Sequence, residues 1–136
     1  MDSAAPLSTE ILYLAWSVVL LLVQLALQGG LGTAELGIRY NAGPRDAGKA
    51  PQSDYARRAD RALSNLLETY PAFIALALAL AVTGKVGGIG AIGAALWFWA
   101  RVVYLPLYLL GIPYLRTLAF VLSAIGLVLM LIRLLG

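Results

Sequence analysis

The chain has 136 residues, of which 61% are hydrophobic and 12% are charged, and its mean hydropathy is +0.84. A soluble domain of this size carries about a quarter charged residues, so the composition excludes a soluble globular protein and indicates a single membrane domain. Because cysteine and histidine are absent, thiol chemistry, disulfides and most zinc or haem sites are excluded, and we expect no metal site. The net charge of +3 does not indicate a nucleic-acid partner, since the basic residues cluster beside apolar runs as topology signals do.

The first apolar run predicts a membrane span over about residues 9–28. Ser8 is a candidate N-cap, and Glu10 falls in the first turn, where the helix dipole favours an acid. The chain begins Met-Asp-Ser without a basic region, and the run is longer than that of a cleavable signal peptide, so we expect the span to be retained. A stretch rich in glycine, proline and charge follows at about 29–54 and predicts a long loop.

Three further spans are predicted at about 55–83, 88–110 and 113–135. The first of these has Asp54 as its candidate N-cap and exceeds the roughly 20 residues that cross a bilayer, so its first two turns should project into water. A GxGxxG motif at 88–93 has no strand before it, and its small residues instead favour close approach of helices in lipid. The sequence therefore predicts an all-α integral membrane protein, a bundle of four transmembrane helices with both termini on one side.

Positive charge is distributed unevenly between the two sides of this bundle. The side with the termini would carry Lys85 and Arg133. The other side would carry Arg39, Arg45, Lys49, Arg57, Arg58 and Arg61, with Arg116 at its edge. The positive-inside rule then places the long loop in the cytoplasm and both termini outside.

Polar residues recur at helical spacing within the spans. One face of the second span carries Arg58, Arg61, Asn65 and Glu68, and a stripe on the third consists of Arg101, Tyr104 and Tyr108. A carboxylate and a guanidinium each cost several kcal/mol in a membrane unless they are paired, so we expect Glu68 and Arg101 to be partners. The surplus arginines then favour an anionic ligand; alternatively, the pair is structural and the arginines are topology signals that snorkel to the interface.

These residues resemble the MAPEG family, the membrane-associated proteins in eicosanoid and glutathione metabolism. The resemblance rests on Arg61-x-x-x-Asn65-x-x-Glu68 followed by a proline, on Arg101-x-x-Tyr104-x-x-x-Tyr108, and on Arg116, and it covers all four spans. The runs at 41–46 and 62–71 resemble the short bacterial branch in particular. The resemblance implies a homotrimer in a bacterial inner membrane, with glutathione held between neighbouring subunits near the cytoplasmic face.

By the same resemblance, glutathione would be bound by Arg61, Asn65, Glu68, Arg101, Tyr104 and Tyr108, with Arg39 as a looser candidate. The catalytic residue would be Arg116, which would stabilise the thiolate. The chain departs from characterised eicosanoid enzymes at Tyr104, where they often carry histidine, and at Phe120, where several carry tyrosine. The spacing from Tyr108 to Arg116 also looks one residue shorter.

The implied activity is that of a glutathione transferase or peroxidase acting on a lipophilic small molecule that arrives through the lipid bilayer. The alternative is a non-enzymatic membrane protein of the same fold that binds a lipid or partner subunits. A transporter is disfavoured because the chain shows no internal repeat.

Overall fold

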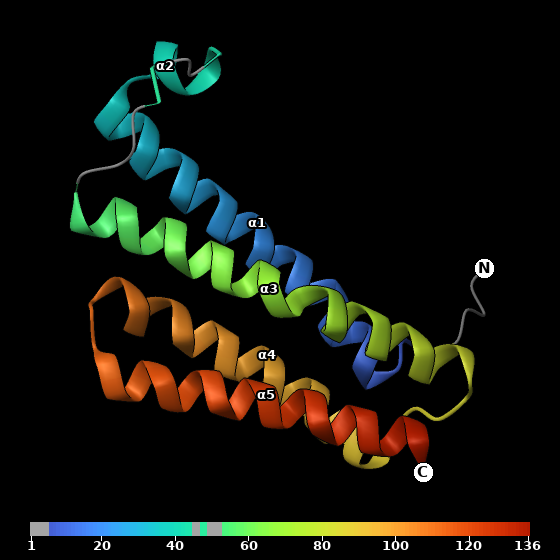
Figure 1. Ribbon diagram of the computed structural model, residues 1–136. Helices are drawn as coiled ribbons and strands as arrows, with labels where there is room; N and C mark the ends of the chain where they lie inside the picture. Colours follow the sequence, from blue (N-terminus) through green and yellow to red (C-terminus); the bar gives the residue numbers. More distant parts are fainter. Residues whose placement is uncertain (1–5, 45–46, 49–52) are drawn as a thin grey trace.

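The computed structural model describes residues 6–44, 47–48 and 53–136, and its helices are α1 (Thr9–Leu36), α2 (Ile38–Ala42), α3 (Asp54–Val82), α4 (Gly88–Leu109) and α5 (Pro113–Leu135). Of the part of the chain that the structure describes, four helices, α1, α3, α4 and α5, are long and apolar enough to cross a membrane, as predicted. They form an all-α bundle in which both termini lie at one end, here called the terminal end (Figure 1). The turn between α4 and α5 lies at the opposite end, here called the loop end.

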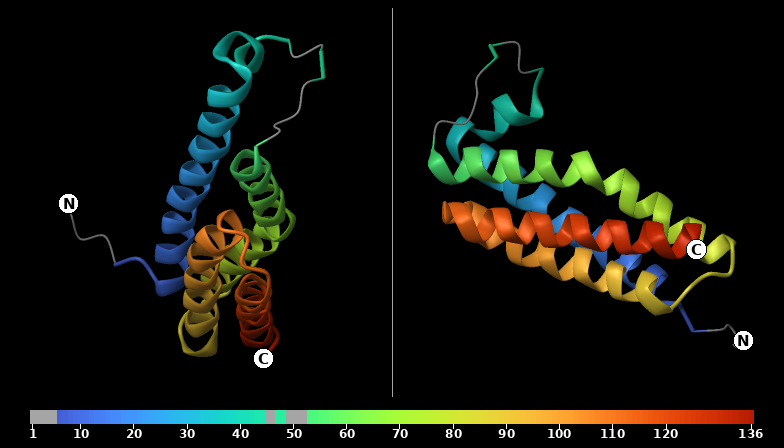
Figure 2. Two further views of the ribbon diagram at one scale, coloured as in Figure 1. Left: turned by 90° about the vertical axis from the view of Figure 1, so that its left-hand side faces the viewer. Right: turned by 60° about the horizontal axis from the view of Figure 1, so that its bottom comes forward.

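The first helix differs from its prediction, because α1 continues past residue 28 to Leu36, into the expected loop. Gly29 and Gly30 do not interrupt it, since a glycine inside a helix costs about 1 kcal/mol but causes no clash. The helix ends at Gly37, whose φ of 90° is disfavoured for residues with a side chain. The expected loop therefore contains the end of α1 and all of α2, which together project beyond the start of α3 (Figure 2).

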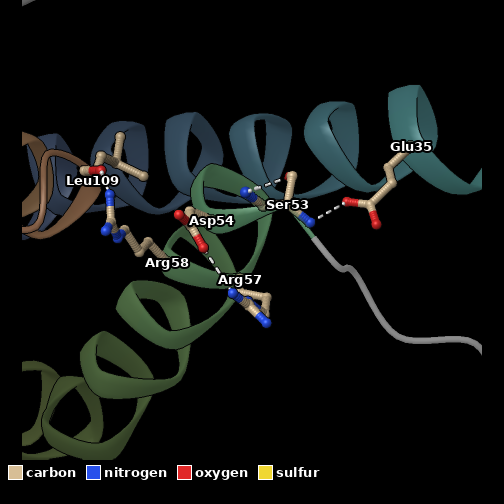
Figure 3. Close-up of polar contacts among 7 residues, drawn as sticks. Glu35, Ser53, Asp54, Arg57, Arg58 and Leu109 are labelled. Carbon is tan, nitrogen blue, oxygen red and sulfur yellow. Dashed lines mark hydrogen bonds and ion pairs between the residues drawn. The ribbon is translucent and has the colours of Figure 1, made fainter.

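Serine side chains cap the first and third helices. Ser8 caps α1 as predicted, but the cap of α3 is Ser53 rather than Asp54. The Ser53 hydroxyl accepts the backbone N–H of Ala56 at 3.2 Å, and the Ser53 backbone N–H donates to the Glu35 carboxylate at 2.9 Å (Figure 3). The start of α3 is thus tied to the end of α1.

Stacked aromatic rings fill the centre of the bundle. The rings of Phe73 on α3 and Trp97 on α4 are 3.9 Å apart and nearly parallel, and the ring of Tyr70 stacks 5.8 Å from that of Trp97. The Tyr70 hydroxyl is hydrogen-bonded to the Ser17 hydroxyl of α1 at 2.8 Å. This cluster joins three helices and fixes the rotation of α3 about its axis.

The helices α4 and α5 pack with their backbones in contact, as the small residues predicted. A Cβ atom built on Gly93 would lie 2.5 Å from the carbonyl oxygen of Gly126, and a Cβ on Gly126 would lie 2.5 Å from the carbonyl oxygen of Gly93. Only glycine fits at either position without a shift of the helices.

At the terminal end, charged side chains hold the turn between α3 and α4. The Lys85 ammonium donates to the Leu134 carbonyl at 2.8 Å, and the Arg133 guanidinium donates to the Lys85 carbonyl at 2.9 Å. The fully buried Glu10 carboxylate accepts the Gly87 backbone N–H at 2.8 Å. The turn is therefore connected to α1 and to α5.

At the loop end, Arg58 of α3 holds the turn between α4 and α5. Its guanidinium donates to the carbonyl of Leu109, the last residue of α4, at 3.1 Å (Figure 3). It also covers Gly111, where a Cβ atom would lie 2.9 Å from the Arg58 Cζ. Gly111 has a φ of 72°, so both conformation and space favour glycine there.

We expect Gly111→Ala to lower the free energy of unfolding by about 1 kcal/mol or more, because alanine is strained at this φ and its Cβ displaces Arg58. Since Arg58→Ala removes the group that the new Cβ meets, the double variant should lose less than the sum of the single losses. Denaturant titration of the four proteins in detergent measures this coupling. Strictly additive losses would show that Arg58 does not rest on the turn.

Candidate functional site

A polar cavity of about 250 Å³ lies between α3, α4 and α5. It is lined by Asn65, Tyr104, Tyr108, Arg116, Thr117 and Phe120. The first four were predicted as site residues from their spacing in the sequence. The structure therefore brings the polar stripes of α3 and α4 together with the arginine at the start of α5.

Arg101 is buried directly behind this cavity and is 1% exposed. Its Nη1 donates to the Asn65 side-chain oxygen at 2.7 Å, and its Cζ lies 4.3 Å from the centre of the Tyr104 ring. Its Nε and Nη2 are buried without a hydrogen-bond partner among the described residues. A buried cation with unmade hydrogen bonds is costly, so this position favours the approach of an anion or a strong acceptor.

The expected ion pair between Glu68 and Arg101 is not formed. Asn65 takes the place of the carboxylate, and Glu68 lies on the exposed surface of α3. Residues three apart on a helix point about 60° apart, and the packing of α3 turns Asn65 rather than Glu68 toward α4. Glu68 is still close enough to Tyr104 to interact electrostatically with its hydroxyl.

Two tyrosines hold the two arginines of the site. The rings of Tyr104 and Tyr108 lie 5.5 Å apart, and the Cζ of Arg116 lies 4.7 Å from the centre of the Tyr108 ring. The face of an aromatic ring attracts a guanidinium, so each arginine rests on a tyrosine. Two positive charges, from Arg101 and Arg116, are thereby held beside one cavity.

Two of the predicted residues do not line the cavity. Arg61 is exposed on α3, and Arg39 is exposed in α2, which belongs to the projecting part of the chain (Figure 2). Conversely, Thr117 and Phe120 line the cavity but were not predicted as site residues. Their positions directly after Arg116 and about one helical turn beyond it could have indicated them.

The groups around the cavity suit a ligand with several acceptors and a net negative charge. Guanidinium groups donate in a fork that matches carboxylates, and phenol, amide and hydroxyl groups can donate beside them. The chain contains no cysteine and no histidine, so a reactive nucleophile would have to come with the ligand.

Comparison with known proteins agrees with this reading of the residues. The model of the MAPEG family matches residues 13–136, which include every residue that lines the cavity and most of each spanning helix. No curated protein and no solved structure matches the chain. The family match covers nearly the whole sequence and coincides with four helices able to span a bilayer, so the chain is an integral, multi-pass membrane protein that belongs to the MAPEG family.

Proposed function

We propose that the polar cavity binds glutathione and that the protein is a glutathione transferase or peroxidase of the microsomal type. The proposal is carried by the buried guanidinium of Arg101, which lies behind the cavity with two nitrogens unpartnered. Glutathione has two carboxylates and one ammonium group, so it matches a site with the guanidinium groups of Arg101 and Arg116 and the nearby carboxylate of Glu68. The family resemblance supports the same ligand.

Arg116 is the proposed catalytic residue. It lies near the start of α5, where free backbone N–H groups and the helix dipole add positive potential. Its guanidinium would stabilise the thiolate form of bound glutathione, and the thiolate is the nucleophile. In conjugation, the sulfur forms a bond to an electrophilic carbon of a lipophilic substrate, and the leaving group departs with its electron pair.

We propose further that the protein is a homotrimer in a bacterial inner membrane, with the loop end in the cytoplasm and both termini outside. Glu68 and Arg61 are exposed on α3 of the single chain. A carboxylate is costly on a lipid-facing surface, so its exposure favours coverage by a neighbouring copy. In that assembly Arg61, Glu68 and Arg39 would belong to a site completed between subunits.

Reduced glutathione at 100 times its Kd is expected to stabilise the wild-type protein by about 2.7 kcal/mol, seen as a rise in melting temperature in detergent. Arg116→Ala should lose glutathione-dependent conjugation of a chloronitrobenzene substrate, because the thiolate loses its counter-charge. Arg57→Ala is the matched control, since Arg57 is an exposed arginine paired with Asp54 outside the cavity.

The outcomes separate the two functions considered from the sequence. A melting temperature that glutathione does not change would favour the non-enzymatic alternative, in which the buried polar groups only join the helices. A rise in melting temperature with equal background rates in wild type and Arg116→Ala would leave glutathione binding and reject the transferase.

A further inference from the structure

A second cavity, of about 450 Å³, opens between α1 and α4 and shares no lining residue with the first. It is lined by Leu12, Tyr13, Trp16, Phe98, Trp99 and Val102 and is here called the aromatic groove. Trp16 and Trp99 are 53% and 55% exposed, whereas Trp97, the third tryptophan of the chain, is fully buried. The groove is therefore open to the surroundings of two membrane-spanning helices.

The groove presents one polar group with a hydrogen to donate. The indole N–H of Trp99 donates to the Tyr13 hydroxyl oxygen at 3.1 Å. A phenol that accepts one hydrogen bond keeps its own O–H, and no hydrogen bond from the Tyr13 hydroxyl to another described residue is formed. A molecule in the groove could accept that hydrogen while its apolar part contacts the aromatic rings.

The depth of this hydroxyl in the membrane follows from its distance to the terminal end. Glu10, Lys85 and Arg133 mark that end, and Tyr13 lies one helical turn beyond Glu10, about 4.5 Å along α1. Tyrosine and tryptophan gather where headgroups meet acyl chains. The hydroxyl is thus at the level of phospholipid ester groups, and the groove continues toward Val102, further along α4 from the terminal end.

We propose that the aromatic groove is a binding site for one acyl chain of a membrane phospholipid, with the Tyr13 hydroxyl donating to the ester carbonyl of that chain. A phospholipid carries the acceptor and the apolar chain on one molecule, in the order and at the depth that the groove presents them. The proposal does not depend on glutathione binding at the other cavity.

Tryptophan fluorescence tests the proposal in the intact protein, because both exposed tryptophans line the groove. The protein is placed in phosphatidylcholine vesicles with increasing fractions of brominated acyl chains, which quench indoles on contact. One series uses ester-linked chains, and the other uses ether-linked chains, which lack the carbonyl. We expect the ester lipid to bind the wild-type groove about fivefold more tightly, the effect of one net hydrogen bond. Tyr13→Phe keeps the ring and should abolish this preference.

A second pair of variants tests the shape of the groove. Val102→Phe places a ring inside it and should weaken quenching by both lipids, whereas Val103→Phe places the same ring on the next, exposed position outside the lining and should not. Equal quenching by ester and ether lipids in the wild type would overturn the proposal. Protection of the tryptophans from both lipids would overturn it too, because it would show that a second copy of the chain covers the groove. Tyr13→Phe decides the matter by itself if Val102→Phe does not fold.

Discussion

Gly126→Ala is expected to cost about 3 kcal/mol or more of the free energy of unfolding, one of the two largest effects of a single substitution that we expect in this chain. The new methyl group would lie 2.5 Å from the Gly93 carbonyl oxygen and 2.8 Å from the Trp97 backbone nitrogen. Both are backbone atoms, which cannot rotate away, so α4 and α5 would have to separate. Denaturant titration in mixed micelles measures the loss.

Gly30→Ala is the matched control for this prediction. Gly30 is an exposed glycine inside α1, and a Cβ atom there would meet nothing within 4 Å. The same added methyl group should raise stability by about 0.5 to 1 kcal/mol, because alanine loses less backbone entropy in a helix. A Gly126→Ala protein as stable as wild type would show that the two backbones are not in contact.

Arg101→Met is expected to change stability and ligand binding in opposite directions. The unliganded protein should gain about 1 to 2 kcal/mol, because an apolar side chain of similar length replaces a buried cation with two unpartnered nitrogens. Glutathione should bind about 10-fold to 100-fold more weakly, since hydrogen bonds to charged groups contribute about 1.5 to 3 kcal/mol. Melting curves with and without glutathione measure both quantities on one sample.

Arg57→Met removes the same charge from an exposed side chain and should leave both quantities nearly unchanged, because exposed ion pairs contribute little. A large loss of stability in Arg101→Met would show that the guanidinium is fully paired without a ligand. Gained stability with unchanged glutathione binding would remove Arg101 from the site while leaving its burial unexplained.

The four spans could be predicted because bilayer thickness sets the length of an apolar helix, so run length alone locates them. The end of α1 could not be predicted. Gly29 and Gly30 resemble a helix end in sequence, but glycine stops a helix only where the backbone turns to positive φ, as it does at Gly37. That turn depends on contacts that a local pattern does not contain.

The candidate site shows the same division between spacing and packing. Helical spacing correctly grouped Asn65 with Glu68 and Tyr104 with Tyr108, since it depends only on the pitch of the helix. It could not show which member of the first group faces Arg101. That choice depends on the rotation of α3, which is fixed by the rings packed in the core.

The contact between Gly93 and Gly126 has a consequence for electrostatics. Where two backbones touch, no layer of side chains remains between the helices to repack or slide. Arg101 and Arg116 are carried by this helix pair, so the spacing of their charges is set by the main chain before any anion arrives. Such preorganisation spares a site the free energy of gathering like charges, and it keeps their field directed at the place where negative charge is to be held.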